Sequence, residues 1–239
     1  MYGDQLRDLE SNGFCVLSGI NVADDDELIS AASLFGTPSA IGNGNPSRLI
    51  SEIAIQSASE SSLHSENWVK FDLHTDSTGY PRPHSVIVMG CLKAARDGGE
   101  SILLLVDSII SSLPADTRRL LQVPLFEFVP AVGWSGHRLI TTVLSERGEH
   151  WRIRWRRDVM SALSRRAEDA LLAMGAAIDA TSPKRIKLQT NDVLIVDNRR
   201  CLHGRAAFGE SSDRHLRRIK MSSLSRADML GSPPSLWLG

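Results

Sequence analysis

The sequence predicts a mainly β protein with a few flanking helices, folded as an antiparallel barrel or jelly roll. Short apolar segments of strand length recur along the 239 residues, and turn residues separate them. Few segments show the apolar spacing of an amphipathic helix. No internal repeat and no break in composition divides the chain, so we expect one domain over residues 1–239.

Composition argues against several functional classes. The chain carries 27 Lys and Arg against 28 Asp and Glu, so no charge excess points to nucleic acid or a membrane surface. Cys15, Cys91 and Cys201 are an odd, widely spaced set, which fits free thiols in a reducing compartment. The N-terminus lacks the order of a signal peptide, and no segment approaches the ~20 apolar residues of a membrane span. We therefore expect a cytoplasmic protein with a small-molecule substrate, and oligomeric state is left open.

The first third of the chain alternates helix, strand and loop. Leu6–Asn12 predicts a short helix that ends at Gly13, and residues 14–20 predict a strand. A second helix is expected in residues 24–36, where acidic residues precede Leu28 and Ile29.

Residues 39–67 are rich in Ser, Asn and Gly and predict a long loop with one strand near residues 49–55. The loop directly precedes His74 along the chain. It either closes over bound substrate or forms a static part of the surface.

From residue 69 onward the sequence has β character. Strands are expected at residues 71–75, 86–92, 101–106, 125–129 and 138–143. The segment Trp151–Arg157 alternates apolar residues with Arg152, Arg154 and Arg156, which predicts one cationic strand face, either solvated or in contact with an anionic substrate. Arg165–Ile178 is the clearest amphipathic helix, and strands follow at residues 185–189, 192–197 and 214–224.

His74 and Asp76 are two residues apart in a short extended segment before an apolar strand. Alternate residues of a strand point to the same side, so the two side chains form either a hydrogen-bonded pair or two ligands to one metal. A His-x-Asp pair alone is weak evidence. The best third ligand is His203, which follows the apolar strand and polar turn of residues 193–198.

Two histidines and one carboxylate that leave coordination positions open are the arrangement of non-heme Fe(II) oxygenases. Structural zinc more often uses thiolates or four closed ligands, and the chain has no Cys-x-x-Cys. Arg214 and Arg218 follow His203 by 11 and 15 residues, and a guanidinium grips a carboxylate with two hydrogen bonds, which suggests a carboxylate-bearing co-substrate. Ser101 adds a hydroxyl directly after a glycine turn.

The sequence resembles the taurine dioxygenase and clavaminate synthase-like Fe(II)/2-oxoglutarate-dependent oxygenases in the order of its motifs: His74-x-Asp76, Gly98-Gly99-Glu100-Ser101, Asp197-Asn198-Arg199-Arg200, His203-Gly204-Arg205 and Arg214. The resemblance spans nearly the whole chain. It implies a double-stranded β-helix core, also called a jelly roll or cupin-like core.

The resemblance also implies the residues of the site. Fe(II) would be held by His74, Asp76 and His203. The distal carboxylate of 2-oxoglutarate would be held by Arg214 and the Ser101 hydroxyl, with Arg218 supporting that carboxylate or meeting the substrate.

The activity that this implies consumes O2 and 2-oxoglutarate and releases succinate and CO2. It hydroxylates, desaturates or cyclises an unactivated C–H of a small amino acid-like substrate or natural-product intermediate. Two alternatives are a non-catalytic metal- or ligand-binding jelly roll and a metal enzyme that does not use 2-oxoglutarate.

Two departures from the family pattern bear on specificity. The family usually has Thr where this chain has Ser101, and the stretch between Val143 and Lys187 is shorter than in many relatives. Arg205 lies on the strand face of His203 and either points into the site or supports it from behind.

Overall fold

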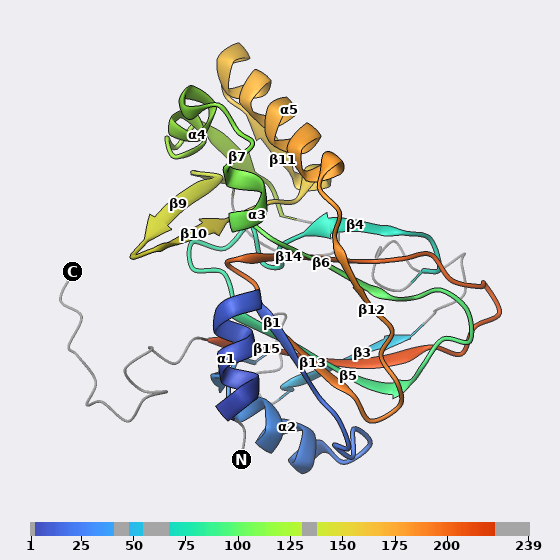
Figure 1. Ribbon diagram of the computed structural model, residues 1–239. Coiled ribbons are helices and arrows are strands. Elements are labelled where there is room, and N and C mark those ends of the chain that lie inside the picture. The colour runs from blue at the N-terminus through green and yellow to red at the C-terminus, as the bar shows by residue number, and fades with distance from the viewer. Residues whose placement is uncertain (1–2, 41–47, 55–66, 131–137, 223–239) are drawn as a thin grey trace, which may run out of the picture.

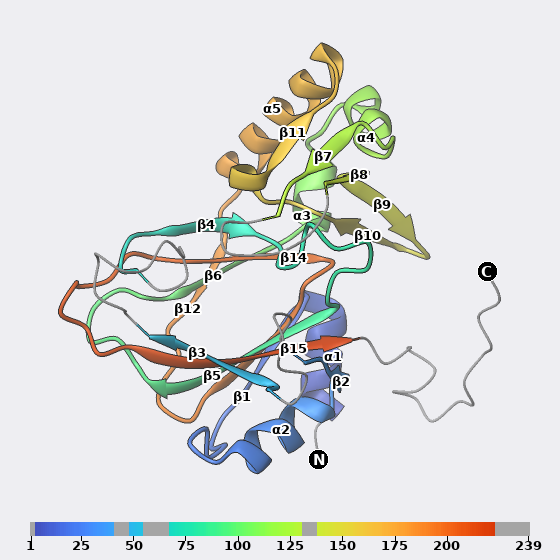
Figure 2. The same cartoon turned by 180° about the vertical axis from the view of Figure 1, so that it is seen from behind.

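Two antiparallel sheets face each other at the centre of the computed structural model, which describes residues 3–40, 48–54, 67–130 and 138–222 (Figure 1, Figure 2). The six-stranded sheet contains, in spatial order, β1 (Phe14–Leu17), β13 (Val193–Asp197), β5 (Val86–Lys93), β15 (His215–Ser222) and β2 (Thr37–Pro38), and β3 (Ile50–Ala54) also pairs with β15. The four-stranded sheet contains β12 (Lys184–Ile186), β6 (Ser101–Leu105), β14 (Cys201–Arg205) and β4 (Phe71–His74). These facing sheets confirm the predicted jelly roll.

The buried strand β13 shows how the six-stranded sheet separates two cores. Leu194 and Val196 point inward and pack with Leu103 and Cys201 of the four-stranded sheet. Val193 and Ile195 point outward, as expected from the two-residue period of a strand, and join a second cluster. Each of these side chains is fully buried. Burying one large aliphatic side chain, compared with leaving it exposed to water, stabilises the fold by roughly 1.5–3 kcal/mol.

Helices α1 (Gly3–Asn12) and α2 (Asp25–Ser33) cover the outer face of the six-stranded sheet. The Asp24 carboxylate caps α2 by accepting hydrogen bonds from the backbone N–H groups of Asp26 at 2.9 Å and Glu27 at 3.0 Å. Gly13 ends α1 with a φ of 77°, the left-handed conformation that glycine adopts most easily.

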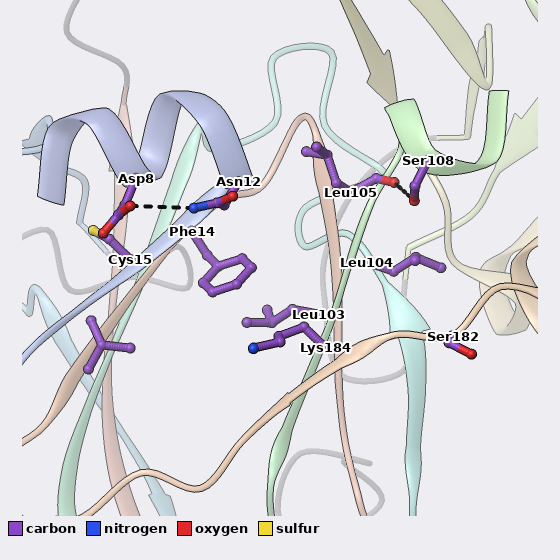
Figure 3. A pocket seen from close by; sticks show the side chains of 11 residues that line it. Asp8, Asn12, Phe14, Cys15, Leu103, Leu104, Leu105, Ser108, Ser182 and Lys184 are labelled. Atoms are coloured by element: carbon purple, nitrogen blue, oxygen red, sulfur yellow. Dashed lines mark hydrogen bonds between the residues drawn. The ribbon is translucent and has the colours of Figure 1, made fainter. Parts of the chain in front are cut away.

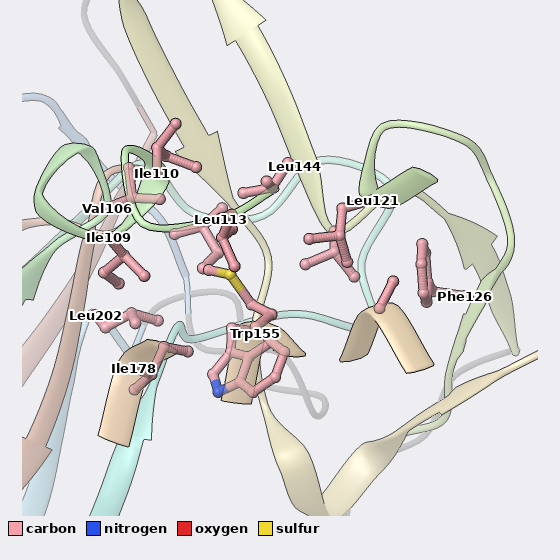
Figure 4. Close-up of a cluster of buried hydrophobic side chains, with 14 of the residues drawn as sticks. Val106, Ile109, Ile110, Leu113, Leu121, Phe126, Leu144, Trp155, Ile178 and Leu202 are labelled. Carbon is pink, nitrogen blue, oxygen red and sulfur yellow. The ribbon is translucent and has the colours of Figure 1, made fainter. Parts of the chain in front are cut away.

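A third layer covers the outer face of the four-stranded sheet (Figure 4). Leu104 and Leu202 of that sheet pack against apolar side chains of the layer, including Phe126 and Trp155. The layer is built from α3 (Asp107–Ile110), α4 (Ala115–Leu121), β7 (Phe126–Phe128), β8 (Leu139–Thr141), β9 (Leu144–Arg147), β10 (His150–Ile153), a 3-10 turn (Arg157–Val159), β11 (Met160–Ala162) and α5 (Arg165–Ala180).

The strand predicted at Trp151–Arg157 is shorter in the structure, and its arginines do not form a free cationic face. Strand β10 ends at Ile153, and the guanidinium of Arg154 donates hydrogen bonds to the backbone oxygens of Tyr80 at 2.7 Å and Pro81 at 3.4 Å. The guanidinium of Arg156 instead pairs with the Asp158 carboxylate at 2.9 Å. The predicted alternation persists, with buried Ile153 and Trp155 between half-buried arginines, but Arg154 and Arg156 have partners within the protein.

Several smaller predictions have clear outcomes. All three cysteines are buried free thiols, and burial raises the pKa of Cys201 to about 12. Within the described residues, no helix is long and apolar enough to cross a membrane.

The strand expected near residues 49–55 is β3, whereas residues 41–47 and 55–66 of the predicted loop lie outside the described residues. The one-domain organisation of residues 1–239 stays a prediction.

Gly98 occupies a tight turn in which only glycine fits. Its φ is 59°, it forms a bridge with Phe208, and an added Cβ would lie 2.0 Å from the Ala207 carbonyl oxygen. We predict that Gly98→Ala lowers the free energy of unfolding by at least about 2 kcal/mol. The cost of a positive φ for alanine adds to the clash between its Cβ and the Ala207 carbonyl oxygen.

Gly148→Ala is the matched control for this change. Gly148 has a similar φ of 61°, and an added Cβ would meet nothing within 4 Å. Urea unfolding should show that the free energy of unfolding of this variant falls by only about 1 kcal/mol, the cost of the left-handed backbone conformation for alanine. Equal losses in the two variants would contradict the clash at Gly98.

Candidate metal centre

His74, Asp76 and His203 converge between the two sheets. The Nε2 atom of His74 lies 3.5 Å from Oδ1 of Asp76, and the Nε2 atom of His203 lies 3.8 Å from the same oxygen. One possible ligand atom from each residue lies within 4.8 Å of the others, and all three residues are buried. These distances allow the three side chains to bind one metal ion.

Strand pairing brings the two histidines together. Strands β4 and β14 are antiparallel neighbours, and their register places His74 directly opposite His203. The two imidazole centroids are 4.5 Å apart. Residues directly opposite in an antiparallel pair point to the same face of the sheet, so both rings point into the space between the sheets.

Asp76 reaches the histidines from a turn and not from the strand face that the sequence suggested, because β4 ends at His74. The backbone N–H of Asp76 donates to Oδ1 of Asn198 at 2.7 Å, and Nδ2 of Asn198 donates back to the Asp76 carbonyl at 3.0 Å. Just before the turn, the backbone N–H of Thr75 donates to the Trp155 carbonyl at 2.7 Å. The turn is therefore fixed on both sides by buried hydrogen bonds.

The protonation states suit metal binding. Nδ1 of His74 lies 2.8 Å from the Asp72 carbonyl, which only accepts, so Nδ1 carries the proton and the Nε2 lone pair faces Asp76. Burial, followed by the neighbouring His203, lowers the pKa of His74 to about 4. Burial alone would raise the pKa of Asp76, but the charges of Lys220 and Arg218 hold it well below its usual value. At neutral pH His74 is therefore neutral and Asp76 is ionised.

The donor set fits Fe(II). Two imidazoles and one carboxylate are the ligands of non-heme iron sites with open positions, and no thiol belongs to the cluster. The second imidazole nitrogen of His74 is already oriented by the Asp72 carbonyl, as is usual for a metal-binding histidine.

A small pocket opens beside the two histidines and contains the residues predicted to bind the co-substrate. It is lined by Ile53, Phe71, His74, Met89, Ser101, His203, Gly204, Arg205, Arg214, Leu216 and Arg218. Both sheets contribute to this lining, so the pocket lies in the interior of the jelly roll.

Arg214 is a buried cation in this pocket. Its guanidinium lies over the Phe208 ring at 5.4 Å and makes no hydrogen bond or ion pair with any residue in the described part of the chain. Burial lowers the pKa of Arg214 to about 10, so it stays cationic at neutral pH. An added Cβ at Gly99 would lie 3.2 Å from Cδ of Arg214, so the glycine turn leaves room for this side chain.

The other two arginines of the pocket have partners. Arg205 donates to the Val69 carbonyl at 2.6 Å and lies over the Phe208 ring at 4.8 Å, so it both lines the pocket and supports it. Arg218 donates to Oδ2 of Asp76 at 3.3 Å, which places it next to the metal cluster.

Two site residues were missed from the sequence. Asn198 holds the Asp76 turn, but from the sequence it was only part of the polar segment Asp197–Arg200 that resembles the family, and no role was predicted for it. The Nζ atom of Lys220 lies 3.4 Å from Oδ2 of Asp76, and the side chain is buried. Lys220 comes two residues after Arg218 on one strand, so strand alternation could have placed both on the inner face.

A larger hollow of about 580 Å3 lies elsewhere, between α1, β1, β6 and β12 (Figure 3). Apolar side chains such as Phe14 and Leu103 form part of its lining, and Asp8 and Lys184 are its charged residues. None of the three metal-cluster residues lines it, so size alone would have pointed away from the candidate site.

Comparison with known proteins agrees with this geometry. A model of the family described as taurine catabolism dioxygenase TauD, TfdA matches residues 3–158 and 164–220. The mitochondrial trimethyllysine dioxygenase of Rattus norvegicus is 27% identical over 155 residues, which is 57% of this chain and 37% of that protein. The alignment thus spans little more than a third of this curated relative.

Solved structures share the fold. Asparagine oxygenase in complex with Fe(II), 3-hydroxyasparagine and succinate superposes with a TM-score of 0.72 at 19% identity, covering 92% of this chain and 78% of that one. The non-heme iron oxygenase OrfP in complex with Fe and alpha-ketoglutaric acid gives a TM-score of 0.78 at 19% identity, covering 93% and 80%.

The lowered pKa of His74 predicts how the metal-free protein responds to acid. Its unfolded value of 6.5 exceeds its folded value of about 4, so the unfolded state binds the proton first. This contribution to stability is complete above pH 6.5 and falls by on the order of 3 kcal/mol as the pH drops to 4. Urea unfolding of EDTA-treated protein at pH 7 and pH 4.5 measures it, and His74→Gln should show a smaller drop. An identical drop in the variant would remove His74 as a cause.

Proposed function

We propose, from the premise that the chain belongs to the taurine catabolism dioxygenase TauD, TfdA family, that it is an Fe(II)- and 2-oxoglutarate-dependent oxygenase. The observation that carries this proposal is one pocket lined by two kinds of group. His74 and His203 of the metal cluster and the buried Arg214 guanidinium, which lacks an anionic partner among the described residues, belong to the same lining. A metal-binding protein without a co-substrate would not require such an arginine.

Each residue has a role in this proposal. His74, Asp76 and His203 hold the metal, with His74 neutral and Asp76 ionised before the metal arrives. When bound, Fe(II) with 2-oxoglutarate and O2 supplies the oxidation of an unactivated C–H, with release of succinate and CO2.

Arg214 binds the distal carboxylate of 2-oxoglutarate, and the Ser101 hydroxyl donates to the same group. Both residues are buried, so they keep water away from the carboxylate and strengthen its hydrogen bonds. Arg218, which pairs with Asp76, lies at the metal end and completes the cationic lining.

The proposed substrate is a small amino acid-like molecule or natural-product intermediate. The support is the fold shared with an oxygenase bound to hydroxyasparagine and with OrfP, seen in complex with 3-hydroxyarginine in another structure. Anionic groups suit a lining that contains three buried or half-buried arginines.

Loss of any metal ligand should abolish the reaction. We predict that His74→Ala, Asp76→Ala and His203→Ala each bring succinate formation to background, because two ligands bind Fe(II) too weakly for turnover. Anaerobic Fe(II) and 2-oxoglutarate titration measures the visible charge-transfer band, and a substrate screen then follows succinate release. Circular dichroism checks the fold of each variant. Near-normal activity in one variant would remove that residue from the ligand set.

The carboxylate anchor gives a second test with an internal comparison. Arg214→Lys should weaken 2-oxoglutarate binding by roughly 10- to 150-fold, because an ammonium cannot replace a two-pronged hydrogen bond to a carboxylate. Ser101→Ala loses one hydroxyl hydrogen bond, worth about 1 kcal/mol, and should cost about fivefold. The charge-transfer titration gives both constants. A greater loss for the serine variant would show that Arg214 is not the main anchor.

A further inference from the structure

The two carboxylate oxygens of Asp76 have different surroundings. Oδ1 faces the two imidazoles, with His74 at 3.5 Å and His203 at 3.8 Å. Oδ2 faces two cations, with Nη1 of Arg218 at 3.3 Å and Nζ of Lys220 at 3.4 Å. The carboxylate is therefore divided into a histidine side and a cation side.

The cations come from the opposite sheet. Ile219 and Met221 of β15 point outward into the cluster beneath α1 and α2, so Arg218 and Lys220 point inward. They cross the space between the sheets to reach a residue that follows β4 of the four-stranded sheet. Lys220 is only 7% exposed, and a buried ammonium is costly unless its charge is compensated.

We propose that Lys220, together with Arg218, positions the Asp76 carboxylate so that only Oδ1 is offered to the metal. The inference rests on the proposed metal site and adds a positioning residue to it. The backbone of Asp76 is fixed at both its N–H and its carbonyl by Asn198, so the remaining freedom of the carboxylate is rotation of its side chain. The partners of Oδ2 therefore hold one oxygen away from the histidines and leave a single oxygen facing them.

Lys220 acts through geometry and through charge. By holding Oδ2 away from the histidines, it keeps a second carboxylate oxygen from occupying a position that the co-substrate needs. Its positive charge also lies beside the ligand of a divalent cation and opposes metal binding, since charges a few ångströms apart interact strongly away from water. Both effects make metal binding weaker than the three ligands alone would give, and the first leaves room for 2-oxoglutarate.

This role predicts opposite changes in two affinities. Lys220→Met keeps the length and packing of the side chain and removes its charge. It should tighten Co(II) binding by roughly tenfold, because a repulsive charge is lost. It should also weaken the binding of 2-oxoglutarate to the metal-loaded protein by severalfold, because Oδ2 is then free to turn toward the metal. A side chain that only stabilised the fold would not produce this opposition.

The test uses anaerobic optical titration of the full chain with Co(II) alone, followed by 2-oxoglutarate. Lys220→Arg keeps the charge and should stay close to the wild type in both titrations. Lys93→Met is the matched control, because Lys93 ends the neighbouring strand β5, is exposed and pairs with Asp213. It removes one lysine charge from the same sheet and should leave both constants unchanged. Circular dichroism and urea unfolding show that each variant is folded.

The outcomes separate this inference from the metal site on which it rests. Wild-type Co(II) binding that disappears in His74→Ala establishes the site. If the site is established and Lys220→Met binds Co(II) equally or more weakly while folded, the positioning role is overturned and the metal site stands. If the folded wild type does not bind Co(II), or His74→Ala binds it as tightly, both the site and this inference fail. A tenfold gain that Lys93→Met shares would be a general charge effect and would also overturn the role of Lys220.

Discussion

The buried carboxylate of Asp76 is the constraint on which the centre of this molecule depends. An ionised group between two sheets is stable only when its lost hydration is replaced, and here the cations Arg218 and Lys220 compensate the charge. The histidines come from the four-stranded sheet and the cations Arg218 and Lys220 from the six-stranded sheet. The two facing sheets of the jelly roll are thus joined by ion pairs as well as by apolar packing, and the metal site lies where these ion pairs form.

Charge also organises the rest of the pocket. Arg205 and Arg214 both lie over the ring of Phe208, which provides an apolar surface that attracts cations without neutralising them. A carboxylate side chain placed there would have satisfied Arg214 and left nothing for a ligand to bind. An aromatic ring instead leaves the positive charge available, so the pocket favours an anionic ligand and stays ordered without one. The Gly98–Gly99 turn, which admits the Arg214 side chain, is part of the same arrangement.

The sequence predicted the strands that carry the site and the main helices around them, because their periods follow from burial on one or two faces. The inward Leu194 and outward Ile195 of β13 are such a case. The order of His74, Asp76, Ser101, His203 and Arg214 was enough to predict which residues come together. The confirmed predictions therefore rest on local periodicity and on a motif that spans the chain.

What the sequence could not predict depends on distant partners. Arg154 lies just beyond strand β10, and its side chain reaches carbonyl groups some 70 residues earlier in the chain. Lys220 fits the alternation of β15, but nothing in its own segment says that its ammonium reaches Asp76 across the space between the sheets. Asn198 is an ordinary turn residue until the Asp76 backbone lies beside it. In each case a polar side chain takes its role from a residue that folding brings close.

The outer layer also takes part in the site through the turn that carries Asp76. Trp155, which packs in the core of that layer, exchanges hydrogen bonds with Thr75, and Arg154 holds the segment beyond the turn at Tyr80. Ser77, directly after Asp76, has a positive φ of 62°, a conformation that costs free energy and persists only when neighbouring contacts fix it. The segment from Ser77 to Pro81 is thus held from the side of the third layer, while the carboxylate itself is held from the six-stranded sheet. The third layer therefore reaches the Asp76 turn through backbone contacts at Thr75 and Tyr80, whereas the cations that hold the carboxylate come from the six-stranded sheet.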